Sequence, residues 1–232
     1  MQSPLNAEFP NNIALVEAKA SFTYAEVEQR TTEFASGLLD QSNDLAEARI
    51  AFLLPAGLDY VTVLHGIWRA GGIAIPLNVA ATESEWAHCL SSTGVTRVVS
   101  AEPYRANIQS LCDSLSIEVS GVNDYLTGLI SALPELTPER KAMIIFTSGT
   151  TSKPKGVVTT HGNIAAQIMA LVDAWAWQEN DVIPLFLPLH HVHGIIAVLS
   201  CALWAGATVH VMPTLALDEL CQQVANDTYS LF

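Results

Sequence analysis

The chain has 232 residues, half of them hydrophobic, which suffices for one large domain or two small ones and excludes global disorder. Asp and Glu outnumber Lys and Arg by 23 to 10, and this acidic balance argues against nucleic acid or an anionic membrane as a partner. The four cysteines have no CxxC spacing and the opening MQSPLNAEFPNN has no signal-peptide pattern, so we expect buried free thiols in a cytoplasmic protein.

Strand and helix patterns alternate through the first 115 residues. Short apolar runs predict strands at residues 13–16, 21–23, 49–54, 73–77 and 97–99, and periodic apolar residues predict helices at 24–39, 58–70, 83–90 and 104–115. Thr23 and Thr82 are expected to cap the helices that follow them, and Gly71-Gly72 is typical of a helix C-terminus. Alternation with short connections predicts a parallel sheet with helices on its faces.

The central feature is the stretch from Ile144 to Gly162, with the sequence IIFTSGTTSKPKGVVTTHG. A buried strand at residues 143–146 leads into six small residues, Thr147 to Ser152, five of which carry hydroxyls. Such a loop can direct backbone N–H groups and hydroxyls onto one anion, while Lys155 adds a point charge. An ordinary loop between two strands is the alternative, but this hydroxyl density beside a lysine favours a phosphate site.

Basic residues of the second half gather around this loop. They are Arg140, Lys141, Lys153 and Lys155, and no Lys or Arg follows Lys155. We therefore expect the local positive charge to lie where a polyphosphate binds. The stretch lacks the GxxxxGK[ST] pattern, so it is not the loop of P-loop NTPases.

The remaining elements suggest a second subdomain. A proline-bearing polar segment at residues 133–139 predicts a boundary, which divides the chain into an α/β subdomain at 1–138 and a phosphate-loop subdomain at 139–232. The pattern predicts helices at 161–175, 195–204 and 218–224, strands at 182–186 and 207–211, and a further strand that begins at Tyr229 and is incomplete at residue 232. The apolar run 195–209 contains Gly206 and is too short to predict a membrane span.

A second cluster of functional residues is the segment LPLHHVHG, from Leu187 to Gly194, which holds three histidines in four positions. Imidazole is the commonest metal ligand in proteins. However, no acidic residue or cysteine lies beside these histidines, and HHxH has no standard ligand spacing, so we predict no metal. Packing or capping histidines at the end of a strand are the other interpretation.

The loop closely resembles the phosphate-binding loop of the AMP-forming adenylating enzymes, which include acyl-CoA synthetases, luciferases and peptide-synthetase adenylation domains. That family's pattern is an aromatic residue, then TSGTTGxPKG, then Thr-His-x-Asn. Residues 146–151, 154–156, 160, 161 and 163 match it, and Ser152 stands where glycine is usual. The segments SFTYAEV at 21–27 and GIWRAGGIAIPL at 66–77 also resemble packing elements of the family.

The resemblance implies an α/β fold with parallel-sheet layers flanked by helices, the first part of the large N-terminal domain of an adenylate-forming enzyme. It also implies a two-step reaction, in which a carboxylic acid attacks the α-phosphate of ATP, with Mg²⁺, and coenzyme A then takes the acyl group from the adenylate. Lys155 and Thr150 are the implied catalytic residues. The implied phosphate-binding residues are Thr147, Ser148, Gly149, Thr150, Thr151, Ser152, Lys153, Lys155 and Gly156.

The histidine segment resembles the LPxFHxxG segment at the wall of the acyl pocket in acyl-CoA synthetases, with His190 in place of the aromatic residue. This implies substrate-binding roles for His191, His193 and Gly194. The aspartate by which peptide-synthetase domains bind an amino group is missing, which favours an acid without an α-amino group.

The same segment, with LWAGAT at 203–208, looks most like the malonyl-CoA synthetase branch of the family. A buried second carboxylate needs a cation, preferably a bidentate arginine. No arginine follows Arg140, so a short or medium-chain monocarboxylate stays an open alternative.

Several segments of the family have no counterpart in this sequence: the YGxTE-like segment, the acidic residue for the ribose and the C-terminal catalytic lysine. The resemblance covers essentially the whole chain, so we interpret it as the N-terminal portion of an acyl-CoA synthetase, inactive alone. It would be a truncated chain, an incomplete gene or one product of a split gene. A non-catalytic nucleotide- or acyl-binding module is the alternative, and an open sheet edge at its end would favour self-association.

Overall fold

The computed structural model describes residues 8–18, 20–147, 154–212, 217–226 and 228–230. The chain folds into two compact units that are interleaved in sequence. Unit 1 contains residues 1–29, 56–58 and 164–232, and unit 2 contains residues 30–55 and 59–163. The sequential division expected after residue 138 stays a prediction.

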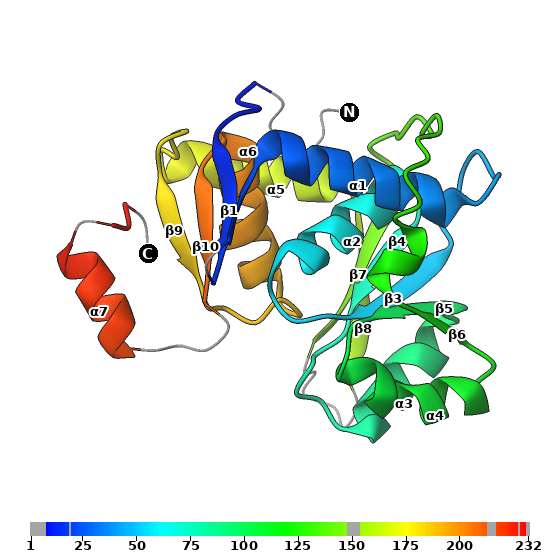
Figure 1. Cartoon of the computed structure of the whole chain (residues 1–232). Helices are drawn as coiled ribbons and strands as arrows, with labels where there is room; N and C mark the ends of the chain where they lie inside the picture. The colour runs from blue at the N-terminus through cyan, green and yellow to red at the C-terminus, as the bar shows by residue number, and fades with distance from the viewer. Residues whose placement is uncertain (1–7, 19, 148–153, 213–216, 227, 231–232) are drawn as a thin grey trace. The chain divides into compact units, whose positions relative to one another are not determined.

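Unit 2 contains a six-stranded sheet in the order β6-β5-β3-β4-β7-β8 (Figure 1). Its strands are β3 (Arg49–Leu53), β4 (Ile73–Pro76), β5 (Arg97–Ser100), β6 (Glu118–Ser120), β7 (Lys141–Thr147) and β8 (Lys155–Thr160). The first five strands run parallel, and β8 returns antiparallel to β7. The expected parallel sheet is therefore present, with an antiparallel strand at one edge.

Helices cover both faces of this sheet. They are most of α1 (Tyr24–Leu39) and α2 (Leu58–Arg69), then α3 (Glu83–Thr93), α4 (Tyr104–Ser114) and the short 3₁₀ helix η1 (Val122–Tyr125). Helices α3 and α4 lie against one face of the sheet (Figure 1). There Trp86, Leu90 and Ile108 belong to one cluster with buried strand residues such as Ile75 and Val98. This continuous apolar cluster forms the core on that side of the sheet.

Unit 1 contains a four-stranded sheet in the order β2-β1-β10-β9, in which β1, β10 and β9 are parallel and β2 is antiparallel. Its strands are β1 (Ile13–Glu17), β2 (Ala20–Thr23), β9 (Val182–Leu185) and β10 (Thr208–Val211). Its helical segments are most of α5 (His161–Ala174), the π-helical η2 (His193–Ser200), α6 (Cys201–Ala205) and α7 (Leu217–Ala225).

The strand expected from Tyr229 onward is wrong for Tyr229 and Ser230, which lie outside any strand. The Ser230 backbone N–H does donate to the Val182 carbonyl at 3.0 Å, so this segment runs beside the start of β9. Residues 231 and 232 lie outside the described residues.

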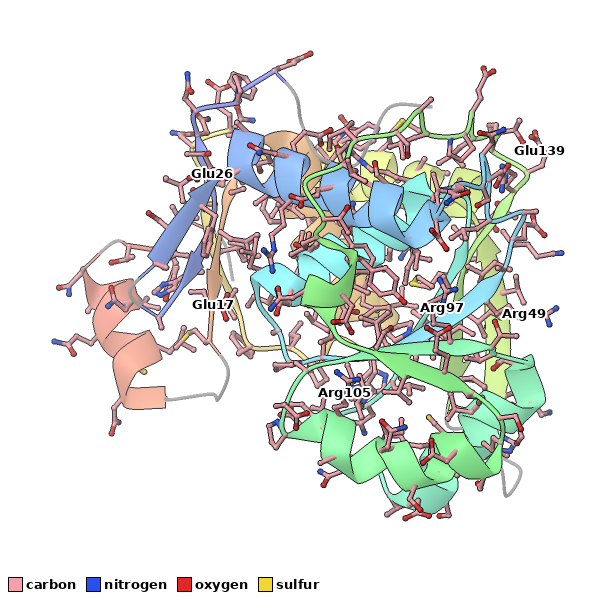
Figure 2. All side chains as sticks on the ribbon, turned by 45° about the vertical axis from the view of Figure 1, so that its right-hand side comes forward. Glu17, Glu26, Arg49, Arg97, Arg105 and Glu139 are labelled. Carbon is pink, nitrogen blue, oxygen red and sulfur yellow. The ribbon has the colours of Figure 1, made fainter. Side chains whose placement is uncertain are left out.

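Both predicted helix caps are confirmed. The Glu26 carboxylate accepts the Thr23 backbone N–H at 2.7 Å, and the Glu26 N–H donates back to the Thr23 hydroxyl at 3.3 Å (Figure 2 labels Glu26). Thr82 and Glu85 form the same reciprocal pair at the start of α3. The hydrogen bonds from Thr23 and Thr82 lower the pKa of Glu26 and Glu85 respectively.

All four cysteines are free thiols, as predicted, but the prediction that they are buried is correct for only some of them. Cys112 and Cys201 are buried and Cys89 is half-buried, whereas Cys221 is exposed on α7. Desolvation raises the pKa of Cys89 and Cys112 to about 11. Among the helices that the structure describes, none is long and apolar enough to cross a membrane.

Candidate functional site

The β7–β8 hairpin in unit 2 carries the predicted phosphate loop. Thr147 pairs with Lys155 and Phe146 with Gly156, so the two ends of the loop are held side by side by the strand register. The Thr147 hydroxyl also lies 3.5 Å from the Lys155 carbonyl oxygen. Predicted site residues 148–153, Thr150 among them, lie outside the described residues. The structure therefore positions both stems of the loop, with Thr147, Lys155 and Gly156.

Arg140 and Lys141 lie at the opposite end of β7 and correct the expectation that four cations face a polyphosphate. The Arg140 guanidinium binds both carboxylate oxygens of Asp44, at 2.6 and 2.7 Å, and the Gly71 carbonyl at 2.8 Å. Lys141 pairs with Glu47 at 3.0 Å. Because hydrogen bonds from Arg140 and Lys141 lower the pKa of Asp44 and Glu47, these cations serve internal pairs at neutral pH.

Lys155 differs from these two cations. It is exposed and has no carboxylate partner within the described part of the chain, whereas five other cations are paired. A glycine is favoured at the neighbouring position 156 for a steric reason. A Cβ at Gly156 would lie 3.0 Å from the Ile144 side chain and 3.4 Å from the Phe146 side chain. The positive charge of Lys155 is thus available to an anion at the loop.

A hollow of about 460 Å³ lies beside these stems. Helix α3 forms one wall, with His88 and Ser92, and the β7–β8 hairpin forms the other, with Phe146 and Val158. Arg49, at the first position of β3 and labelled in Figure 2, also lines the hollow and donates to the Thr93 carbonyl at 3.0 Å. No Asp or Glu is among the described residues that line it.

His88 is a site residue that sequence reasoning missed. Its Nε2 atom lies 2.8 Å from the carbonyl oxygen of Pro154, and its ring meets the Phe146 ring edge to face at 5.9 Å. The contact joins residues 66 positions apart. Within the helix pattern of residues 83–93, His88 carries no local signal that would identify it.

The histidine segment belongs to unit 1 and follows β9. The rings of His190 and His191 lie 4.1 Å apart, and burial, together with the charge of His191, lowers the pKa of the half-buried His190. His191 and His193 are exposed. The His191 N–H closes a turn with the Pro188 carbonyl at 3.3 Å, and the His191 carbonyl accepts from Ile195 at 3.1 Å.

The close packing of the backbone around Gly194 explains why a residue without a side chain stands at this position. A Cβ at Gly194 would lie 2.7 Å from the Pro188 carbonyl oxygen, closer than any side chain tolerates. The segment then continues into η2, where the Ser200 hydroxyl bonds the Ile195 carbonyl at 2.7 Å across a wide turn. π-Helical turns are rare and are frequent at functional sites. Gly194 is the second residue of η2, and the absence of a side chain there lets the start of η2 lie against the Pro188 carbonyl.

His193 lines a cavity of about 370 Å³ in unit 1. Its other walls are apolar and include Trp175, Trp177 and Phe186. Trp177 is 5% exposed, and its indole N–H has no hydrogen-bond partner among the described residues. Of the three predicted substrate residues, His193 thus lines the cavity, Gly194 shapes the turn, and His191 lies exposed on it. An apolar group with a hydrogen-bond acceptor would suit these walls.

Comparison with known proteins points in one direction. The model of a family described as AMP-binding enzyme matches residues 5–228. The mitochondrial malonate–CoA ligase ACSF3 of Homo sapiens is 35% identical over 228 residues, which cover 93% of this chain and 39% of that protein. The Mus musculus protein of the same name is 32% identical over 226 residues, with the same two coverages.

A solved structure supports the same relationship. The ATP-bound MatB from Rhodopseudomonas palustris superimposes with a TM-score of 0.86 at 25% identity, over 95% of this chain and 46% of that one. The chain thus spans about two fifths of the length of the curated relatives it matches.

Proposed function

The chain belongs to the AMP-binding enzyme family, and on that premise we propose that it is the N-terminal portion of an ATP-dependent acid–CoA ligase. The observation that carries the proposal is the hairpin β7–β8, whose register holds together the two ends of the TSGTTSKPKG loop. In the ligase, a carboxylic acid is activated as an acyl-adenylate and then transferred to coenzyme A. The portion described here supplies the phosphate loop and part of the acid pocket.

Lys155 fits a role at the phosphates of ATP because its charge is not neutralised by a described carboxylate. A fixed cation at that place stabilises charge that develops on phosphate oxygens. Thr147 and Gly156 hold the stems, and residues 148–153, with Thr150, supply hydroxyl and N–H donors in the proposal. Positioning and charge neutralisation are the contributions that phosphoryl-type transfer needs from a protein.

Mg²⁺ is the metal implied by this chemistry, and it neutralises phosphate charge when bound. No group of three His, Cys, Asp or Glu in the described part of the chain is placed to hold a metal. In this proposal Mg²⁺ would be held by the phosphate oxygens and by hydroxyls of the loop. No described residue is assigned to coenzyme A.

Malonate is the acid that we propose, because the two vertebrate relatives are named malonate–CoA ligases. In this proposal His191 and His193 face the substrate. An arginine that pairs its second carboxylate would come from outside residues 141–232, because that range contains none. A short or medium-chain monocarboxylate is the alternative, and the apolar walls of the cavity at His193 favour it.

Acid-dependent exchange of pyrophosphate into ATP tests the ligase with the full-length parent. We expect exchange with malonate above methylmalonate, acetate and medium-chain acids when they are ranked by kcat/KM. A preference for a monocarboxylate would overturn malonate and leave the ligase, whereas no exchange with any acid would overturn the ligase. The 232-residue chain alone is expected to show no exchange.

A nucleotide-binding module without catalysis is the second candidate, and the charge of Lys155, which no described carboxylate neutralises, favours it. Calorimetric titration of the 232-residue chain with ATP and Mg²⁺ separates the candidates. Saturable heat without exchange activity in the parent would support the module.

We also propose a cytoplasmic location, which imaging of the tagged parent tests against the mitochondrial location in the names of the two relatives.

A further inference from the structure

His88 contacts both stems of the phosphate loop. Phe146, the residue before Thr147, packs against its ring at 5.9 Å with an interplanar angle of 73°. Pro154, the residue before Lys155, presents its carbonyl oxygen to Nε2 at 2.8 Å. One half-buried side chain on α3 therefore lies against the chain as it leaves the sheet and as it returns to it.

The chemistry of this contact is fixed by Pro154. A carbonyl oxygen only accepts, so Nε2 of His88 carries the proton and donates it. Proline has no N–H, so this carbonyl is its one backbone group able to form a hydrogen bond. The strand pairing ends at Thr147 and Lys155. His88 therefore adds one hydrogen bond immediately beyond the last strand pair.

Helix α3 provides a rigid support for His88. The Thr82–Glu85 capping box fixes its first turn, and Gly94 ends it in the left-handed conformation at φ 63°. Trp86 and Leu90 are buried in the core, and the Trp86 indole donates to the Asn78 carbonyl at 2.9 Å. A site residue on such an element holds its geometry more precisely than one on a loop.

We propose that His88 is a positioning residue that holds the returning stem of the loop, and with it Lys155, ready for the phosphates of ATP. The inference rests on the function proposed above. Without the donor, ATP itself must order the stem, and this cost lowers the affinity for ATP. The proposed acid-binding residues, His191 and His193, are not part of this contact, so we expect the KM for the acid to stay unchanged.

Three variants of the full-length parent test this role. His88→Phe keeps the ring against Phe146 but removes the donor, and we expect the KM for ATP to rise about three- to tenfold, the value of one hydrogen bond. His88→Gln keeps an N–H donor and should restore part of the loss. Ser91→Ala is the matched control, because Ser91 is exposed on the same helix and its hydroxyl bonds only that helix's own carbonyls.

Tryptic cleavage of the 232-residue chain gives a readout that does not depend on the reaction. Trypsin does not cut the Lys153–Pro154 bond, so cleavage in this stem reports the Lys155–Gly156 bond. The His88→Phe chain should be cut about three- to tenfold faster than the unchanged chain. The cleavage rate of the His88→Gln chain should lie between these two rates. If the full-length parent has no ligase activity but His88→Phe still speeds cleavage of the 232-residue chain, the proposed function is wrong. The role of His88 in holding the stem is then still supported.

Two results would overturn the role of His88. One is a cleavage rate at Lys155 that His88→Phe leaves unchanged. The other is an equal rise in KM for ATP and for the acid, which a loss of general stability would produce. Urea unfolding of each variant identifies any that fail to fold, and His88→Gln then carries the comparison.

Discussion

The two ends of the β7–β8 hairpin are held in different ways. At the base, Arg140 binds Asp44 and Gly71, and its own carbonyl accepts the His161 N–H at 2.9 Å. The Gly162 N–H donates to Pro138 at 2.8 Å, and the Trp68 indole donates to Ala142 at 2.8 Å. At the loop end, the described contacts beyond the strand pairing are the 3.5 Å approach of the Thr147 hydroxyl to the Lys155 carbonyl and the two contacts of His88, with the Pro154 carbonyl and the Phe146 ring.

This difference separates stability from ligand binding along one hairpin. A base with many buried contacts unfolds only with the whole unit, while an end with few contacts opens at low cost. The loop end can therefore adjust to a ligand without loss of the sheet beneath it. Changes at the base should alter the free energy of unfolding, and changes at the loop end should alter binding.

Acid should weaken the base most. His65 and His161 each pack edge to face against Trp68 and are 1% and 3% exposed. Burial, and then the charges of Arg69 and Arg140, lower the pKa of His65 to about 3 and that of His161 to about 4. The fold thus holds both histidines neutral, whereas the unfolded chain binds protons below pH 6.5.

The free energy of unfolding that depends on these two neutral histidines is therefore fully present above pH 6.5. It is lost as the pH falls from 6.5 toward the pKa of His161, about 4, and that of His65, about 3. Each histidine should contribute roughly 2–3 kcal/mol to the loss between pH 7 and 4.5. Urea unfolding across that range measures it. His65→Leu should remove about half of the pH dependence, and Thr62→Val, a buried change on the same helix without a titrating group, should leave it intact. An unchanged slope in His65→Leu would contradict the assignment.

Removal of the Arg140 side chain should have the next largest effect. It eliminates the two bonds to Asp44 and the bond to the Gly71 carbonyl, at a side-chain exposure of 17%. We expect Arg140→Ala to lower the free energy of unfolding by about 2–3 kcal/mol in urea titrations. Arg140→Lys keeps the charge but loses the paired geometry, so its loss should be smaller. Equal stability of the alanine variant would show that the base is held by other contacts.

Local signals made much of the fold predictable. The caps at Thr23 and Thr82 each have a glutamate three residues later, so the start of α1 and of α3 could be predicted from neighbouring residues alone. β6 is too short, at three residues, for an alternating pattern to appear. β8 was missed because its sequence KGVVTT directly follows the loop, and its glycine and threonines gave no clear strand signal.

Tertiary pairing was not predictable in the same way. Asp44 and Arg140 are 96 residues apart, so no local pattern could show that Arg140 is already paired. The loop residues followed from their spacing and from a family resemblance. His88 and Arg49 come from other elements, which the fold alone brings to the same hollow.

At the loop end, Lys155→Ala should change binding and leave stability nearly unchanged. Lys155 is exposed and unpaired among the described residues, so we expect the free energy of unfolding to change by less than about 0.5 kcal/mol. In the full-length parent the KM for ATP should rise about tenfold, because a charge-assisted contact is lost, while the KM for the acid stays constant.

Lys141→Ala is the matched control at the other end of β7. It breaks the half-exposed pair with Glu47, so it should cost at most about 1 kcal/mol and leave the KM for ATP unchanged. If both lysine variants raised the KM for ATP to the same extent, the contrast between the two ends of the hairpin would be wrong.

The smallest effect concerns the outer edge of this same hairpin. β8 ends the sheet of unit 2, and neighbouring Val157 and Val158 are each 48% exposed. In unit 1, by contrast, Ser230 bonds the backbone of Val182 and so occupies the start of the β9 edge.

An open apolar edge strand pairs readily with another chain, and charged residues prevent this. We therefore expect weak self-association of the 232-residue chain through β8, visible by light scattering at high concentration, and its loss in Val158→Lys. Because Val158 follows the loop and lies away from the ion pairs of the base, the variant should keep its urea midpoint. A monodisperse monomer at high concentration would contradict the open edge, and association that persists in Val158→Lys would place the contact elsewhere.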